Sequence, residues 1–268
     1  MNTVPVRGTT AVTAGTRRWL PHANGATSCD LRLICLPYAG GGASVFAPLR
    51  RHAPDWLDVL PVQLPGRENR MAEAAIAAMP TLVDALTEAL APVLDQPYAL
   101  LGYSVGARVA FCLTQALARA GLPPPRLVMV AAHRAPDLPA RGPALHTLPS
   151  AEFWDRLARY EGTPAAILDN PEFRALFEAP LRADFALAET PLDGAGQRLP
   201  CPVAAFAGSR DALVSPADIA GWARATSAGF DCTTIAGGHF FLRDAAEEFR
   251  AAVYDRLAPL ARRARHAA

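Results

Sequence analysis

The sequence contains no lysine, and all 26 of its basic residues are arginine. The 25 acidic residues nearly balance them, so the net charge of +1 gives no reason to expect nucleic acid or an anionic membrane as a partner. No run of about 18 apolar residues occurs, so no membrane-spanning helix is expected. We attribute the arginine bias to codon usage rather than to function.

Cysteine is also scarce, with five residues scattered between Cys29 and Cys232. Their odd number, and the absence of CxxC or HxxxH spacing, argue against a disulfide framework and against a metal site. Three of them lie inside apolar runs, which predicts buried, reduced thiols.

The first 28 residues lack the apolar segment that a signal peptide needs. We therefore expect residues 1–28 to form a disordered N-terminal tail and the protein to be cytoplasmic. The chain is 51% hydrophobic and 19% charged, which is typical of a globular protein. Residues 29–268 suffice for one α/β domain with an insertion.

Short apolar runs alternate with helical patterns along this domain. Strands are predicted at 31–36, 57–63, 98–101, 126–131, 200–207 and 230–235. Helical periodicity occurs at 81–94, where Thr81 is the expected N-cap, after residue 104, and from 244 to about 264. The alternation predicts an α/β fold, with a mostly parallel sheet flanked by helices on both faces.

The strands at 126–131 and 200–207 are separated by roughly 70 residues, which is too many for one crossover. At about 147–190, Phe153 and Trp154 begin an apolar stripe with helical spacing, and Phe173 begins a second one. One interpretation is a helical insertion that only packs against the core. We favour a helical lid whose inner face forms a pocket, because ligands bind at the carboxyl edge of such sheets.

The main chemical signal is Gly102-Tyr103-Ser104-Val105-Gly106, which lies between a predicted strand and a helix. Gly-x-Ser-x-Gly in this context indicates a nucleophile elbow, where both glycines are needed because the two backbones nearly touch. The turn exposes the serine hydroxyl at the positive end of the helix. Ser104 is therefore the candidate nucleophile.

A serine nucleophile needs a base, and the histidines that follow it are His133, His146, His239 and His266. His239 is favoured because it lies between the last strand and the last helix, in a loop that two preceding glycines allow to turn sharply. A purely structural role is the alternative. His133 follows the strand after the elbow, where it either lines the pocket or faces solvent.

The candidate acid is Asp211, which directly follows a strand and would hold the imidazole in the required tautomer. A turn or cap role beside Ser215 is the alternative, and Asp137 is the second candidate acid. The backbone N–H groups of Val105 and Ala39 are the expected oxyanion donors. The glycine-rich loop around Ala39 has neither GxGxxG nor a P-loop lysine, which argues against phosphate binding.

With these residues in place, the chain resembles the type II thioesterases of polyketide and nonribosomal peptide synthesis, which have the α/β-hydrolase fold. The matching segments include LPYAGGGASVF at 36–46, QLPGRENR at 63–70, GYSVGARVAF at 102–111, AAHRAPDLP at 131–139, LRADFALAE at 181–189, AGSRDALVSP at 207–216 and GGHFFL at 237–242. The resemblance implies a Ser104, His239 and Asp211 triad. In that family the position of Tyr103 is usually His, and a small or basic residue usually stands at His133.

The resemblance further implies hydrolysis of acyl thioesters from the phosphopantetheine arm of an acyl or peptidyl carrier protein, which removes stalled or aberrant acyl groups. The expected reaction uses an acyl-enzyme and neither a metal nor a diffusible cofactor, and the protein is expected to be a monomer. The alternatives are an acyltransferase or carboxylester hydrolase on the same machinery. A non-catalytic carrier-protein-binding module is the third possibility.

Two further sets of residues complete these expectations. The acyl pocket is expected to be lined by residues that flank the catalytic positions or belong to the lid: Tyr38, Tyr103, His133, Phe153, Trp154 and Phe240. Carrier proteins are usually acidic, so Arg67 and Arg70 are candidate docking residues, with a solvated loop as the alternative.

Overall fold

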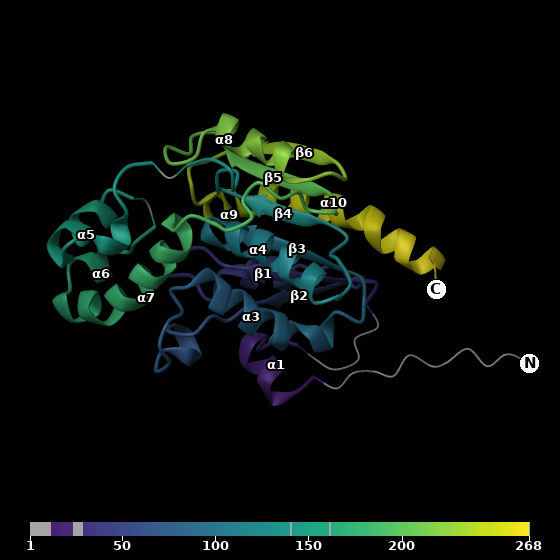
Figure 1. Ribbon diagram of the computed structural model, residues 1–268, viewed down its shortest axis with the longest axis horizontal. Helices are drawn as coiled ribbons and strands as arrows, with labels where there is room; N and C mark the ends of the chain where they lie inside the picture. The colour runs from purple at the N-terminus through teal and green to yellow at the C-terminus, as the bar shows by residue number, and fades with distance from the viewer. Residues whose placement is uncertain (1–11, 24–28, 140, 161, 268) are drawn as a thin grey trace, which may run out of the picture.

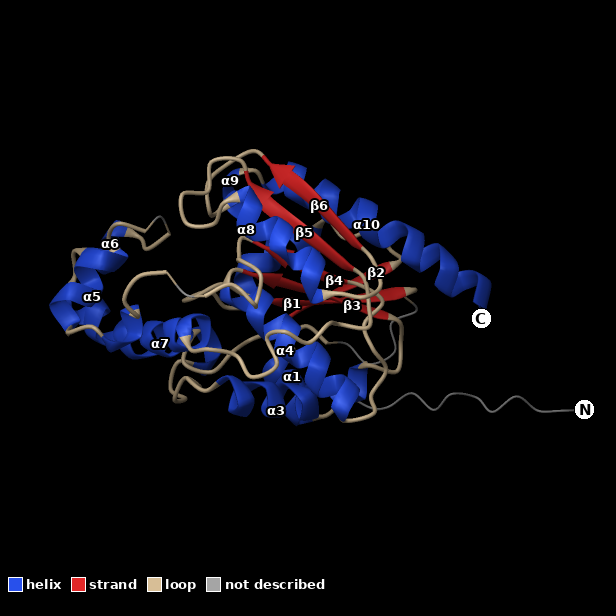
Figure 2. Cartoon of the chain, turned by 45° about the horizontal axis from the view of Figure 1, so that its top comes forward, coloured by secondary structure: helices blue, strands red, loops and turns tan. Residues whose placement is uncertain are grey.

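The computed structural model describes residues 12–23, 29–139, 141–160 and 162–267, with side chains as far as residue 262. Its strands form one six-stranded sheet in the order β2-β1-β3-β4-β5-β6, and every neighbouring pair is parallel (Figures 1 and 2). The strands are β1 (Leu31–Leu36), β2 (Leu57–Pro61), β3 (Tyr98–Tyr103), β4 (Val128–Ala131), β5 (Val203–Gly208) and β6 (Phe230–Ile235). The predicted α/β class and the six predicted strands are confirmed, with shifts of a few residues at the ends.

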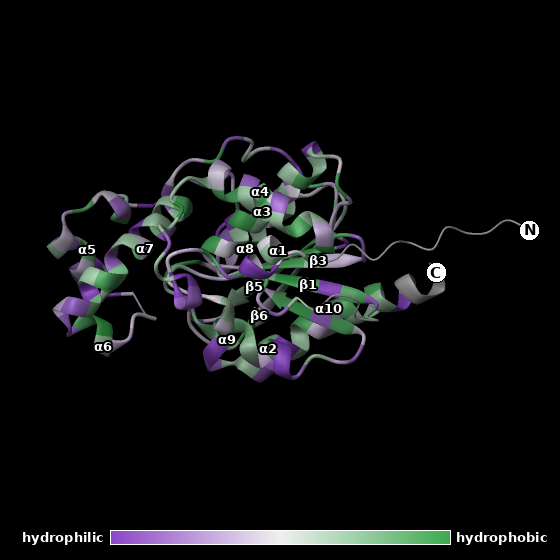
Figure 3. Cartoon of the chain, turned by 90° about the horizontal axis from the view of Figure 1, so that it is seen from below, coloured by the Kyte–Doolittle hydropathy of each residue, from purple (hydrophilic) through white to green (hydrophobic). Residues whose placement is uncertain are grey.

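Helices cover both faces of the sheet (Figure 3). One layer contains α3 (Met79–Leu90), α4 (Val105–Arg119) and α8 (Pro216–Ala220); the other contains α2 (Ala47–Arg51), α9 (Phe241–Asp244) and α10 (Ala246–Ala267). Strand residues alternate between the two layers, as the pleat requires: Ile34 packs with the first cluster, and Leu33 and Cys35 pack with the second. Short 3-10 helices lie at η1 (Ala43–Phe46), η2 (Glu68–Arg70), η3 (Ala91–Val93), η4 (Leu145–Thr147) and η5 (Gly221–Ala225).

The start of α3 differs from the expected one. The N-cap is Ala78 rather than Thr81, because Pro80 in the first turn has the φ that a helix needs and lacks the N–H that would be unpaired there. The helix therefore begins at Met79, two residues before the predicted cap.

An N-terminal helix, α1 (Ala14–Trp19), packs against α3. Leu20 is completely buried in the core that α3 and α4 share, and the Gln63 N–H donates to Trp19 O at 2.7 Å. The expected disordered tail is thus wrong for residues 12–23, because Leu20 and Ala23 are buried in the main core and Trp19 packs against it. Residues 1–11 and 24–28 lie outside the described residues.

The insertion forms α5 (Ser150–Leu157), α6 (Ala165–Leu168) and α7 (Pro171–Glu189), close to the predicted bounds of 147–190. These helices lie beyond one end of the sheet, away from the end of α10 (Figure 1). They have a small core of their own, whose buried members are Leu145, Phe153, Trp154, Leu157 and Leu181.

No disulfide joins the five cysteines, all of which lie in the described part of the chain, and Cys35, Cys112 and Cys201 are buried, which confirms the prediction. Burial raises the pKa of Cys112 and of Cys201 to about 11, so both stay as thiols at neutral pH. Among the described residues, no helix has both the length and the apolar character to cross a bilayer.

Candidate active site

The turn between β3 and α4 has the tight geometry that the sequence predicts. Ser104 adopts φ 52° and ψ −121°, in the region that side-chain-bearing residues rarely occupy. A Cβ on Gly102 would lie 2.2 Å from Gly106 O, and one on Gly106 would lie 2.2 Å from Leu36 O. Both glycines are therefore required by the close approach of β3, α4 and the end of β1.

The structure brings together the serine, histidine and aspartate that the sequence singled out. His239 Nε2 lies 3.1 Å from Ser104 Oγ, and His239 Nδ1 lies 2.8 Å from Asp211 Oδ2. The Asp211 side chain has no exposed surface, and its Oδ1 accepts N–H groups from Leu213 at 2.8 Å and Val214 at 3.1 Å. Because a carboxylate only accepts, it fixes the Nδ1–H tautomer and leaves Nε2 free to accept the serine proton.

Asp137, the second candidate acid, has a different partner. Its carboxylate pairs with the Arg224 guanidinium through contacts of 2.7 and 3.1 Å at the protein surface. Asp211 is thus the carboxylate that contacts His239.

Tyr103, directly before the serine, does not line the pocket. Its ring is completely buried against Phe241 and Phe249, and its hydroxyl donates to His239 O at 2.6 Å and accepts from Leu242 N at 3.3 Å. The expectation of a pocket residue is therefore wrong, because strand alternation turns this side chain to the opposite face from the elbow. Tyr103 instead supports the loop that carries His239.

Three contacts fix the loop that follows β1. The Gly40 N–H donates to Asp184 Oδ2 at 2.7 Å, the Gly41 N–H to Tyr38 O at 2.9 Å, and the Ala43 N–H to Gln63 Oε1 at 2.9 Å. Ala39, which precedes them, borders the same cavity as Ser104. Val105 is the first residue of α4, so its amide has no acceptor within the helix.

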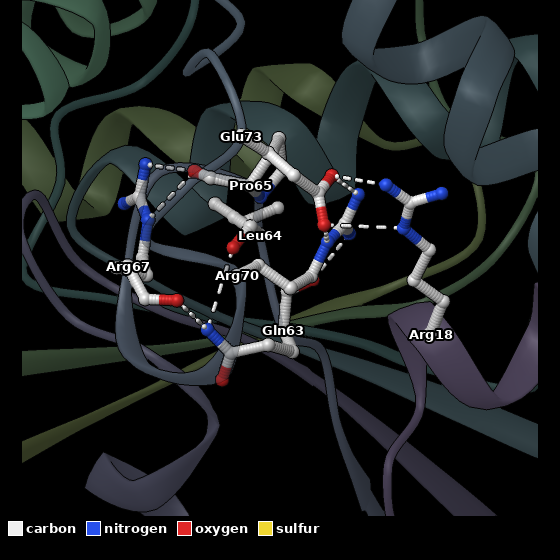
Figure 4. A network of polar contacts seen from close by, with 7 residues as sticks. All are labelled: Arg18, Gln63, Leu64, Pro65, Arg67, Arg70 and Glu73. Atoms are coloured by element: carbon white, nitrogen blue, oxygen red, sulfur yellow. Dashed lines mark hydrogen bonds and ion pairs between the residues drawn. The ribbon is translucent and has the colours of Figure 1, made fainter.

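Arg67 and Arg70 are not surface residues, so the expected docking role is wrong. Arg67 is 5% exposed and pairs with Asp184, while Arg70 is 6% exposed and pairs with Glu73. Figure 4 shows the contacts around this loop, in which Arg70 joins Arg18 in holding Glu73. The hydrogen bond from Arg70 lowers the pKa of Glu73 to about 2.

A cavity of about 390 Å³ opens at Ser104 and His239. The predicted pocket residues Tyr38, His133 and Phe240 line it, together with Arg108 and with side chains of the lid that include Leu157, Tyr160, Leu181 and Phe185. The lid approaches closely, since a Cβ on Gly162 would lie 2.1 Å from Phe240 Cζ. Phe153 and Trp154 do not line this cavity, because they fill the lid's own core instead.

His133 is held neutral within the cavity. Burial, with the nearby charge of Arg108 as the next cause, lowers the pKa of His133 to about 3. Its Nδ1 lies 2.8 Å from Arg134 O, and Trp222 Nε1 donates to His133 O at 2.7 Å.

Two residues of this site were not assigned from the sequence. Asp184 is 1% exposed on α7, and Arg108 lies one turn after Ser104 on α4 with 6% exposure. The available signal was a charged residue on the buried face of an otherwise apolar helix. Burial of such residues requires partners, and these partners lie far away in the sequence.

A parallel sheet of this order, with the Ser, His and Asp constellation at its carboxyl edge, is the architecture of an α/β hydrolase. The chain belongs to the thioesterase family, since the family model described as "Thioesterase domain" matches residues 31–256. It is 33% identical over 231 residues to the gramicidin S biosynthesis protein GrsT of Aneurinibacillus migulanus, covering 86% of this chain and 90% of GrsT.

Solved structures of thioesterases also resemble this chain in fold and sequence. The type II thioesterase BorB from the borrelidin biosynthetic cluster matches with a TM-score of 0.78 and 30% identity, covering 90% of this chain and 97% of BorB. The type II thioesterase YbtT from the yersiniabactin NRPS/PKS pathway matches with a TM-score of 0.79 and 25% identity, covering 89% and 97%. The family and fold that the sequence predicted are therefore confirmed.

Proposed function

We propose that this thioesterase hydrolyses acyl thioesters on the phosphopantetheine arm of acyl or peptidyl carrier proteins, and so clears stalled or aberrant acyl groups from a synthase. The observation that carries the proposal is the continuous series of contacts from Asp211 through His239 to Ser104, with distances of 2.8 and 3.1 Å. The similarity to BorB and YbtT supports the substrate class.

In the proposed reaction, Ser104 Oγ attacks the thioester carbonyl while His239 Nε2 takes its proton. The amides of Ala39 and Val105 stabilise the oxyanion, and Asp211 stabilises the imidazolium. The C–S bond then breaks, and the sulfur leaves as a thiolate that takes the proton from His239. Water, deprotonated by His239, then attacks the acyl carbonyl. The C–O bond to Ser104 breaks, and Ser104 Oγ takes back the proton from His239. These groups and water balance every step, so we propose that neither a metal nor a diffusible cofactor takes part.

We further propose that the enzyme acts as a monomer in the cytoplasm, where cysteines stay reduced. The same acyl-serine intermediate would serve an acyltransferase or a carboxylester hydrolase. Hydrolysis of thioesters is favoured by the family to which the chain belongs.

The test uses acyl-pantetheine thioesters and matched oxygen esters, with thiol release and product mass as readouts. We expect free carboxylic acid as the product, faster turnover of the thioester, and loss of turnover in Ser104→Ala by a factor of about 10³ or more. Unchanged hydrolysis in Ser104→Ala would overturn the mechanism. Transfer of the acyl group to an added amine or alcohol, in place of water, would favour the acyltransferase. Carrier binding without hydrolysis by the wild type would favour a binding module.

A further inference from the structure

The tautomer of His133 follows from its hydrogen bond. Nδ1 lies 2.8 Å from Arg134 O, and because a carbonyl only accepts, Nδ1 carries the proton. Nε2 is then an unprotonated acceptor, and within the described part of the chain it has no hydrogen-bond donor. His133 lines the cavity that Ser104 and His239 share, so Nε2 is available to a ligand there. The low pKa of His133, about 3, keeps the ring in this state at neutral pH.

Arg108 supplies the opposite kind of group to the same cavity. Its Nε donates to Leu187 O at 3.1 Å, and its Nη2 donates to Thr190 O. A guanidinium has five N–H groups, and Nη1 has no acceptor among the described residues. Since Arg108 also lines the cavity, N–H donors remain for a ligand.

Both side chains flank the nucleophile. Arg108 lies four residues after Ser104, which is one turn into α4 on the same side of the helix. His133 lies two residues beyond Ala131, whose carbonyl accepts the Ser104 N–H at 2.8 Å. A group that bridges Arg108 and His133 would therefore belong to the first few carbons of the acyl chain.

Each of the other charged side chains that line the cavity also has a partner among the described residues. The Glu189 carboxylate accepts from Leu145 N at 2.9 Å and lies 2.6 Å from His146 Nδ1. Arg141 pairs with Asp218 at 2.8 Å, and Arg134 donates to Pro139 O at 2.7 Å.

We propose that Arg108 and His133 form a subsite for a hydroxyl group near the reacting carbonyl, so that the enzyme prefers 3-hydroxyacyl thioesters to unsubstituted ones. The proposal rests on the thioesterase function proposed above. A hydroxyl donates to the neutral imidazole and accepts from the guanidinium at the same time.

Other polar substituents satisfy at most one of the two residues. A carboxylate or a ketone accepts from Arg108 but brings lone pairs against the unprotonated Nε2. An ammonium group donates to His133 but is repelled by the guanidinium. An unsubstituted chain leaves both groups without a partner in a site that the acyl chain has desolvated.

The experiment is a competition between hexanoyl-pantetheine and 3-hydroxyhexanoyl-pantetheine thioesters, with each enantiomer tested and the free acids quantified by mass. The ratio of the two kcat/KM values is independent of the amount of folded enzyme. We expect a ratio of roughly ten in favour of one hydroxy enantiomer for the wild type, as one net hydrogen bond to a ligand hydroxyl gives. In His133→Leu the ratio should fall to near one.

Two further variants distinguish a loss of hydroxyl recognition from a general structural effect of the substitution. His133→Gln keeps an acceptor oxygen and should retain part of the preference. His52→Leu, at the exposed C-cap of α2, should keep the wild-type ratio. A wild-type ratio near one, an unchanged ratio in His133→Leu, or a preference for 3-aminohexanoyl or dicarboxylic thioesters would overturn the subsite while leaving the hydrolase function intact. If no thioester is hydrolysed, the proposed function fails, and the subsite fails with it.

Discussion

Arg67 and Asp184, which are 117 residues apart in the chain, are joined by two hydrogen bonds of 2.6 and 3.0 Å, with less than a tenth of either side chain exposed. The same carboxylate accepts the Gly40 N–H at 2.7 Å. The pair thus links the loop after β2, the lid helix α7 and the loop that carries the Ala39 amide. This buried ion pair therefore holds the loop of the expected oxyanion donor in place.

Substitution of Asp184 should lower both the free energy of unfolding and kcat, and a double variant distinguishes the two effects. Asp184→Leu leaves the buried Arg67 guanidinium without its counter-charge, and we expect a loss of about 3–5 kcal/mol in the free energy of unfolding. The double variant Arg67→Met/Asp184→Leu should recover most of that stability, because an apolar pair can replace a buried ion pair. It should still lower kcat by a factor of about 10–100, since the Gly40 tether is lost. Recovery of kcat together with stability would contradict the positioning role. Arg70→Met, in the same loop, should be less stable but keep its kcat.

Tyr103→Phe should weaken the support of His239. The substitution removes the donor to His239 O and the acceptor of Leu242 N, so two buried backbone groups lose a partner. We expect a loss of about 1–3 kcal/mol in the free energy of unfolding and a several-fold lower kcat with little change in KM. Chemical denaturation and steady-state kinetics check this, and a kcat equal to that of the wild type would argue that the hydroxyl does not orient the histidine loop.

Gly106→Ala should prevent folding. The new Cβ would lie 2.2 Å from Leu36 O, and neither β1 nor α4 can move without opening the core. Gly196→Ala is the matched control, because no described residue other than its chain neighbours lies within 4 Å of the point that its new Cβ would occupy, and it should stay within about 0.5 kcal/mol of the wild type. Soluble expression and circular dichroism distinguish the two; a folded, active Gly106→Ala protein would show that the elbow is less tight than described.

The depressed pKa of His133 predicts a pH dependence of stability. Between pH 6.5, which is the ordinary histidine pKa, and about pH 3, the His133 ring is protonated in the unfolded chain but not in the folded protein. The free energy of unfolding should therefore decrease as the pH falls through this window, and His133→Leu should reduce the slope. Denaturation at several pH values tests this, with His52→Leu as control. In nuclear magnetic resonance spectra the His133 ring should show no protonation between about pH 8 and pH 4, and a midpoint near 6.5 would contradict the buried neutral state.

Leu20→Ala measures the contribution of the N-terminal helix. Leu20 is completely buried, so its truncation should cost about 2–5 kcal/mol. A disordered tail would instead give no measurable change. Thermal or chemical denaturation decides between the two, and Trp19→Ala, which removes the ring 4.3 Å below the Arg70 guanidinium, should cost less.

The sequence allowed the elbow, the base and the acid to be predicted because parallel strands end at one edge of the sheet. Ser104, Asp211 and His239 each follow a strand within a few residues, so the chain order alone brings them near one another. The glycines of the elbow carry a steric requirement that is local, and local requirements can be recognised in sequence.

Features that depend on distant partners could not be predicted in this way. Nothing near Arg67 in the chain reveals that it is buried, because its partner Asp184 belongs to the lid. Helical periodicity identified the apolar stripe of Phe153 and Trp154, but periodicity does not say whether that stripe faces a ligand or neighbouring lid helices. Leu20 belongs to an apolar segment too short to indicate a buried helix.

The two halves of α7 differ in how they are attached. Its C-terminal half is bonded to the catalytic layer through Asp184 and through the Leu187 carbonyl, whereas Phe173 and Leu176 near its start are 43% and 49% exposed. Pro180 lies between the halves and removes one helical hydrogen bond. Substitutions on α5, α6 and the first turns of α7 should therefore be tolerated more readily than substitutions beyond Pro180, which also act on the catalytic layer.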